Sequence, residues 1–251
     1  MKVCCLIREQ PHYRADAFKG GLKRVGATFT DERTCDVLVI WNRYGHYNNL
    51  ADQVEKRGGI VLVAENGYLG NDFCGDRWYA ISRTQHNGAG WWPDGGPERW
   101  DGLNVILAPF RSEGDDIVVL PQRGIGPQGV AMPGQWAREA VARLVKTTRR
   151  RVRVREHPGQ KESIPLEHDL STAYAVATWG SGAAIKALAM GIPVYADFPK
   201  WIGAPAATPI GKELNRSEQD RLDMFRRLIW AQWRLSEIET GAAFARLLQG
   251  L

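Results

Sequence analysis

Residue types suited to binding phosphate lie in two loops of the second half of the sequence. A short strand ends in the turn His157-Pro158, and a Gly/Ser-rich turn at 178–182 leads from an apolar strand into a helix over 183–190. Exposed amides and the positive end of the helix dipole make a helix N-terminus favourable for anions. The pattern predicts a phosphate or pyrophosphate site built from four residues: Arg123, His157, Ser181 and Gly182. The alternative is a turn that only connects strand to helix, with His157 an ordinary buried histidine.

Two side chains are candidates for a general base. Glu65 follows a buried strand, and desolvation there would raise the pKa of its carboxyl group. His86 lies in the Gly-rich loop 83–97, which could close over a substrate. The alternatives are a salt-bridge or capping role for Glu65 and an exposed loop position for His86.

Basic and aromatic residues suggest a polyanionic partner. The net charge is +5, the chain has ten tryptophans, and arginines gather at 149–155. Such a composition suits nucleic acid, although the arginine run could equally be a solvated helix end. The loop 83–97 carries the predicted acceptor-binding residues: Arg83, Asn87, Trp91 and Trp92.

Alternating strand and helix patterns predict an α/β fold. Continuous apolar runs at 35–41 and 60–64 are typical of parallel strands buried on both faces, and the rhythm recurs after residue 117. We expect two Rossmann-like lobes with a cleft between them: an N-terminal acceptor lobe over 1–112 and a C-terminal donor lobe over 113–251. The latter would include terminal helices at 217–234 and 237–248, the first capped by Ser217.

Several classes of protein are disfavoured. The sequence has no apolar run of about 18 residues, so we expect no membrane span, and the apolar run near the N-terminus is too short for a signal peptide. The four cysteines show no zinc-like spacing, and a reduced, cytoplasmic setting fits them best. Asp115-Asp116 reads as a solvated turn, so we expect no metal site.

The order of short motifs resembles the capsule polysaccharide biosynthesis family, which includes Kdo-transferring enzymes with GT-B-like lobes. The motifs are Glu65 to Leu69, Leu120 to Gln122, His157-Pro158, Thr178 to Gly182 and Ala187 to Val194. The resemblance implies a glycosyltransferase that requires no metal and uses a nucleotide-sugar, with a UDP-sugar favoured and a CMP-sugar as the alternative. It extends the predicted donor site to further residues: Gln122, Pro158, Thr178, Gly180 and Lys186. Lys186 stands where the family has a glutamate that commonly holds the donor ribose.

Three functions follow from combining these observations. The first is transfer of a sugar to a hydroxymethylated base such as hydroxymethylcytosine in duplex DNA, as phage-type DNA glycosyltransferases do, with the base flipped out of the helix. The second is transfer to a surface or capsular glycan. The third is a non-catalytic nucleotide- or nucleic-acid-binding module. A sugar-nucleotide epimerase is a lesser alternative, because only Glu65 and Asp94 could supply its carboxylates.

Overall fold

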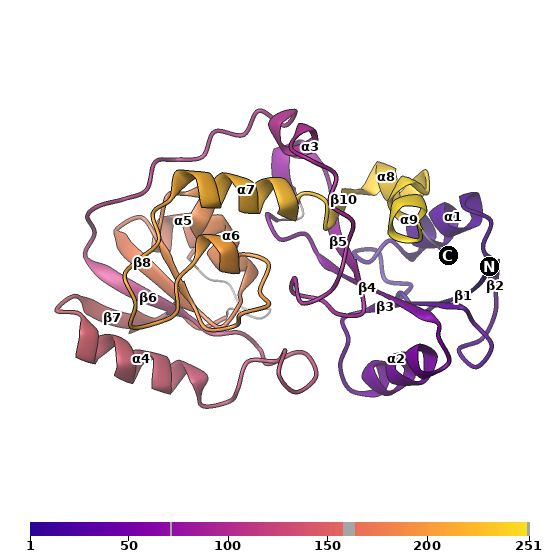
Figure 1. Cartoon of the computed structure of the whole chain (residues 1–251), viewed down its shortest axis with the longest axis horizontal. Coiled ribbons are helices and arrows are strands. Elements are labelled where there is room, and N and C mark those ends of the chain that lie inside the picture. The colour runs from indigo at the N-terminus through magenta and orange to yellow at the C-terminus, as the bar shows by residue number, and fades with distance from the viewer. Residues whose placement is uncertain (71, 158–163, 250–251) are drawn as a thin grey trace.

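The computed structural model describes residues 1–70, 72–157 and 164–249. It contains two sheets, and Figure 1 shows them in separate lobes, with helices packed around each. We call them the first and second lobe. The protein is thus an α/β protein with two Rossmann-like lobes, as the sequence predicted.

The first lobe is built on a six-stranded sheet. Its spatial order is β10-β5-β4-β3-β1-β2, and the four strands β4-β3-β1-β2 run parallel. The strands are β1 (Lys2–Cys5), β2 (Thr28–Phe29), β3 (Val37–Trp41), β4 (Ile60–Asn66), β5 (Trp78–Arg83) and β10 (Gln232–Arg234). The helices are α1 (Ala15–Arg24), α2 (His46–Lys56), α3 (Glu98–Asp101), α8 (Leu235–Glu239) and α9 (Ala242–Leu247), with the 3₁₀ turn η1 (Phe73–Gly75).

The second lobe is built on a four-stranded parallel sheet in the order β7-β6-β8-β9. Its strands are β6 (Asp116–Leu120), β7 (Arg151–Val154), β8 (Ala173–Thr178) and β9 (Val194–Ala196). Its helices are α4 (Trp136–Thr147), α5 (Leu166–Asp169), α6 (Gly182–Ala189) and α7 (Glu218–Leu228), with the 3₁₀ turn η2 (Ala204–Ala206). Helix α7 is capped by Ser217, whose hydroxyl accepts from the Asp220 amide at 3.1 Å, as its capping sequence predicted.

The parallel parts of the two sheets share one strand order. In each, the first strand pairs with both the second and the third, so the order reverses beside it: at β1/β3 in the first lobe and at β6/β8 in the second. Ligands of open α/β sheets bind outside the carboxyl ends of strands at such a switch point. The loops after β1, β3, β6 and β8 are therefore the places to look for a site.

Strand β5 differs from the parallel strands of its sheet. It pairs antiparallel with β4, and the described part of the connection between them, residues 67–70 and 72–77, contains only the short turn η1. A parallel return would need a crossover of a dozen or more residues, usually a helix.

The C-terminal segment also differs from the prediction. The expected helix over 217–234 ends at Leu228, and Gln232–Arg234 forms β10, which pairs antiparallel with β5. This pairing covers the backbone of β5, which would otherwise be an open sheet edge. Figure 1 shows α7 leading from the second lobe into β10, with α8 and α9 beside α1. The boundary at residue 112 stays a prediction, but the terminal strand and helices pack in the first lobe.

The two lobes share one continuous apolar core. A single cluster of buried residues includes Val3 and Val39 of the first sheet and Val118 and Val176 of the second. The loop 84–91 lies between the lobes: a Cβ added to Gly88 would collide with the backbone and side chain of Ile202. The predicted closing loop is therefore a packed wedge at the junction of the lobes.

Candidate functional site

A cavity of about 770 Å³ lies between the lobes and is lined by the loops at both switch points. This volume is in the range of small-molecule sites. From the first lobe it is lined by Arg8, His12, Tyr13, Trp41, Asn42, Tyr44, Glu65, Asn66, Gly67, Tyr68, Gly70, His86 and Asn87. From the second lobe it is lined by Leu120, Pro121, Gln122, Arg123, Ile125, Arg155, His157, Ile164, Pro165, Leu166, Ser181, Gly182, Ala183 and Lys186.

The turn before α6 is held by side chains from its own lobe. Thr178 Oγ1 donates to the Leu120 carbonyl at 3.2 Å and accepts from the Ser181 amide at 2.9 Å. Gln122 Nε2 donates to the Gly180 carbonyl at 3.0 Å, and Ser181 caps the helix through the Ala183 amide at 3.2 Å. These bonds fix the helix N-terminus, whose first residues line the cavity.

The second-lobe wall is basic. It carries Arg123, Arg155, His157 and Lys186, and it has no carboxylate among the described lining residues. Partial desolvation and the neighbouring Arg123 and Arg155 lower the pKa of His157 below its usual 6.5. The imidazole is therefore neutral near pH 7, and a bound anion would favour its protonation. Lys186 Nζ lies 3.7 Å from Glu167 and close to the turn at Gly70.

Among the described residues that line the cavity, Glu65 is the one that carries a carboxylate. Its Oε1 accepts from the Tyr68 hydroxyl at 2.7 Å and from the Asn87 amide. Among the described residues, no group donates to Oε2. Tyr68 is buried, and desolvation together with the charge of Glu65 raises its pKa well above 10. Tyr68 thus stays protonated and keeps donating to Oε1.

His86 is 4% exposed, and both ring nitrogens are hydrogen-bonded. Nδ1 accepts from the Arg43 amide at 3.2 Å, so Nε2 carries the proton and donates to the Ile125 carbonyl at 3.2 Å. Arg43 is itself buried and pairs with Asp52 at 2.6 Å and Glu55 at 2.7 Å. His86 therefore links the first lobe to the loop after β6 and has no nitrogen left for a substrate proton.

The predicted acceptor-binding residues do not stay together. Asn87 lines the cavity, whereas Arg83, Trp91 and Trp92 do not. Trp92 is 4% exposed and donates to the Arg227 carbonyl at 3.2 Å, so it is a core residue. Arg83 donates to the carbonyls of Leu247 at 2.6 Å and Gln249 at 2.9 Å and lies over the 47% exposed ring of Trp91.

The predicted donor residues divide into two groups. Gln122, Arg123, His157, Ser181, Gly182 and Lys186 line the cavity. Thr178 and Gly180 support it from behind through the bonds described above. Pro158 lies outside the described residues.

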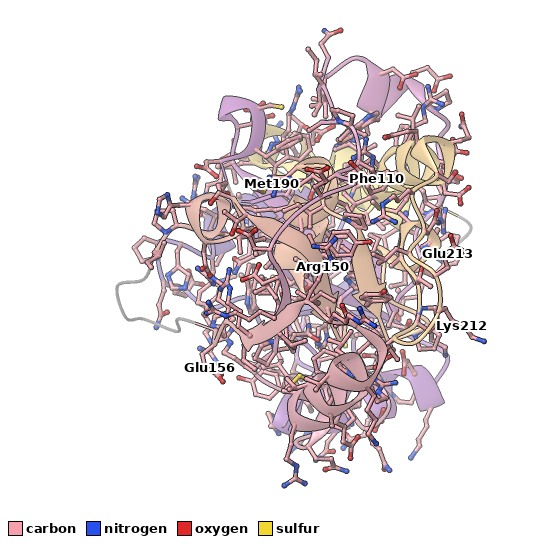
Figure 2. The ribbon with its side chains drawn as sticks, turned by 90° about the vertical axis from the view of Figure 1, so that its left-hand side faces the viewer. Phe110, Arg150, Glu156, Met190, Lys212 and Glu213 are labelled. Carbon is pink, nitrogen blue, oxygen red and sulfur yellow. The ribbon has the colours of Figure 1, made fainter. Side chains whose placement is uncertain are left out.

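The arginine run is largely used within the fold. Arg150 lies over the Tyr174 ring at 3.8 Å, and Figure 2 shows it near the middle of the second-lobe face, while Glu156 lies at the rim. Arg153 pairs with Asp116 and, at 2.9 Å, with Asp169, and Arg155 pairs with Asp169 at 2.6 Å. Arg149 and Arg151 remain exposed. The run is therefore not a free basic stripe.

Sequence reasoning missed the rest of the first-lobe wall. Arg8 and Asn42 follow β1 and β3 at the switch point, and Tyr13 packs edge-on against Trp41 with ring centroids 4.7 Å apart. Asn42 and Asn87 both adopt a positive φ, at 56° and 57°, which is uncommon outside glycine. The position of Arg8 directly after the first strand was a usable signal.

Comparisons with known proteins support the fold. No protein-family model matches the chain, and no curated protein matches its sequence. Among solved structures, the Thermosulfurimonas dismutans KpsC β-Kdo 2,4 transferase is 14% identical, with 89% of each chain covered and a TM-score of 0.57. The β-Kdo 2,7 transferase of the same KpsC is 13% identical, covering 97% of this chain and 99% of that one, with a TM-score of 0.59. At these identities the similarity shows a GT-B-like, glycosyltransferase-type fold.

Two kinds of feature are absent from the described residues. They contain no helix with the length and apolar character needed to cross a bilayer. They also contain no cluster of three or more His, Cys, Asp or Glu side chains placed to hold a metal ion. All four cysteines are unpaired thiols.

Proposed function

We propose that this protein is a glycosyltransferase that moves a sugar from a nucleotide-sugar donor to an acceptor hydroxyl, with Glu65 as the general base. The observation that carries the proposal is the opposition of two unlike walls in one cavity. One wall presents a carboxylate whose Oε2 accepts no hydrogen bond from the described residues, and the other presents a helix N-terminus with basic side chains. Transfer needs both: a base for the acceptor and positive groups for the leaving phosphate.

The two walls come close enough to serve one substrate pair. A Cβ added to Gly182, at the start of α6, would lie 3.8 Å from the Tyr68 carbonyl, and one added to Gly70 would lie 3.4 Å from Lys186 Nζ. The turn that follows Glu65 at the end of β4 and the N-terminus of α6 therefore border the same space. Binding both substrates there would convert their encounter into a step within one complex.

The proposed step balances as follows. The acceptor oxygen forms a bond to the anomeric carbon of the donor while its proton passes to Glu65 Oε2. The bond from that carbon to the phosphate oxygen breaks, and the phosphate leaves with the electron pair. The amide of Gly182, the positive end of the α6 dipole and the charges of Arg123 and Lys186 stabilise the negative charge on the leaving group.

We propose a UDP-sugar as the donor, a CMP-sugar as the alternative, no metal requirement and a reduced, cytoplasmic setting. For the acceptor we favour a glycan over duplex DNA. The sequence features that suggested DNA are used inside the fold: Trp92 in the core, Arg83 on terminal carbonyls, and Arg150, Arg153 and Arg155 on neighbouring groups.

The test is a donor screen with the whole chain. Hydrolysis of UDP-sugars and CMP-sugars is followed with and without glycan acceptors, and separately with hydroxymethylated duplex DNA. We expect turnover of one donor class, enhanced by a glycan, and its loss in Glu65→Gln. Binding of a donor without turnover in any arm would instead identify a non-catalytic module, and mass added to DNA would reverse the choice of acceptor.

A further inference from the structure

Gln232 is a fully buried polar residue in β10 whose side chain reaches the turn that follows Glu65 at the end of β4. Its Oε1 accepts from the Tyr68 amide at 2.9 Å and the Leu69 amide at 3.4 Å. Because both partners are N–H donors, the atom facing them must be the oxygen. The contact joins positions 164 residues apart in the chain.

The turn held by Gln232 carries the partner of the proposed base. Tyr68 donates from its hydroxyl to Glu65 Oε1 at 2.7 Å and accepts there from the Gly88 amide at 3.1 Å. Gln232 holds the backbone of the same tyrosine. A shift of that backbone would move the hydroxyl away from Glu65, and displacements of about 1 Å near reacting groups can reduce rates about 100-fold.

The side-chain nitrogen of Gln232 argues against packing as the sole role of this residue. Within the described part of the chain, its Nε2 is buried and has no hydrogen-bond partner. Leaving a buried donor unpaired is destabilising. An apolar side chain of similar size would fill the space without that cost, so the accepting oxygen is what distinguishes glutamine here.

We propose that Gln232 is a positioning residue that sets the orientation of Glu65 through Tyr68, so that the C-terminal strand completes the acceptor side of the site. This inference rests on the proposed function of Glu65. It assigns a role in that chemistry to a segment outside the cavity lining.

Three variants of the full-length chain test the proposal. Gln232→Met keeps the side-chain length and removes the accepting oxygen, whereas Gln232→Glu keeps an accepting oxygen at the same reach in either protonation state. Trp233→Phe is the matched control, because Trp233 is also buried in β10 but contacts Arg99 and Trp230 instead. The readouts are kcat and KM for the donor and acceptor found in the screen, and hydrogen exchange at the Tyr68 and Leu69 amides.

We expect Gln232→Met to lower kcat about 10-fold to 100-fold with the donor KM within about twofold, and to lose protection at the two amides. Gln232→Glu should recover most of the kcat, and Trp233→Phe should lower the melting temperature without a comparable loss of kcat. Unchanged kcat in Gln232→Met, or an equal loss in Trp233→Phe, would overturn the positioning role. If Gln232→Met does not fold, a folded Gln232→Glu that fails to retain kcat and amide protection overturns that role as well.

A failure of the Gln232 proposal can be distinguished from a failure of the proposed glycosyltransferase function. A wild-type chain that turns over no donor refutes the proposed function, and the positioning role fails with it. Amide exchange would still report whether the contact exists. An active wild type with an unaffected Gln232→Met refutes the positioning role alone.

Discussion

The two walls of the cavity are built in opposite ways. On the first-lobe wall, Glu65 is fixed by hydrogen bonds from Tyr68 and Asn87, and Tyr68 is fixed in turn by Gly88 and Gln232. On the second-lobe wall, the backbone turn at 178–182 is fixed, but the basic side chains of Arg123 and Lys186 extend into the cavity from an exposed or half-buried surface. A proton acceptor depends on strict geometry, whereas phosphate can be held by several mobile charges. The wall with the more demanding chemistry is therefore the preorganised one.

Glu65→Gln should have the largest effect of any single change on the first wall. Loss of a general base lowers kcat about 10²–10⁴-fold, while donor binding on the opposite wall should change less than about twofold. Steady-state kinetics and calorimetric donor titration measure the two effects. Asp94→Asn is the control, since Asp94 lies outside the cavity and pairs with Arg227 at 3.6 Å. An equal loss of kcat in Glu65→Gln and Asp94→Asn would contradict a specific role of Glu65 in the first wall.

Gly88→Ala should disrupt the junction that supports the first wall. Gly88 has a φ of +76°, and the added Cβ would collide with Ile202. Gly26 has a φ of +81° with open space around it, so Gly26→Ala carries the backbone strain alone. We expect the free energy of unfolding to fall by about 1 kcal/mol for Gly26→Ala and about 2–4 kcal/mol for Gly88→Ala, measured by urea denaturation. A similar loss of unfolding free energy in Gly88→Ala and Gly26→Ala would show that the packing between Gly88 and Ile202 adjusts to the added methyl group.

Tyr68→Phe should lower kcat by less than Glu65→Gln does, and stability by less than Gly88→Ala does. It removes one bond to Glu65 and one from Gly88 and keeps the buried ring, so we expect about 1–2 kcal/mol less stability and a kcat lower by about 10-fold. Tyr79→Phe is matched in burial and loses a bond to the His12 carbonyl, so it should lose stability without that fall in kcat. Thermal melts and initial rates distinguish these outcomes.

The second wall should respond to pH. Because the pKa of His157 is lowered in the folded protein, the unfolded chain binds more protons in the window below about 6.5, and this group's contribution to stability falls as pH falls through that window. A donor diphosphate favours the protonated imidazole, so its affinity should rise about 3–10-fold between pH 8 and pH 6. A UDP-sugar is the suitable probe, because its phosphodiesters do not titrate there. His157→Gln should flatten the dependence, and an unchanged slope would show that His157 does not face the donor.

The sequence predicted the second wall better than the first for a physical reason. The residues Gln122, His157 and Ser181 each follow a parallel strand of one sheet, and carboxyl ends of such strands meet at one edge. Local pattern therefore suffices to bring them together. Their roles in binding remain predictions.

The first wall depends on contacts that no local pattern records. Gln232 reaches the site only because β10 pairs with β5. The helical pattern of 217–228 led to the prediction of one helix through residue 234, so the strand was missed. Trp91 and Trp92 are neighbours in sequence, yet Trp91 is half exposed and Trp92 is in the core, because Trp91 forms an isolated bridge with Arg83 while Trp92 packs against Arg227. His86 was predicted as a base from its loop, but the carbonyl of Ile125 and the amide of Arg43 occupy both of its nitrogens.

The pairing of β10 with β5 has a consequence for folding during synthesis on the ribosome. Gln232 pairs with Ala80, so β5 waits for a partner that is synthesised roughly 150 residues later. At about 5–20 residues per second this delay is on the order of 8–30 s. During that time β5 presents an open edge, which is a template for pairing with other chains. The first lobe therefore has an unpaired strand edge throughout the synthesis of residues 84–231.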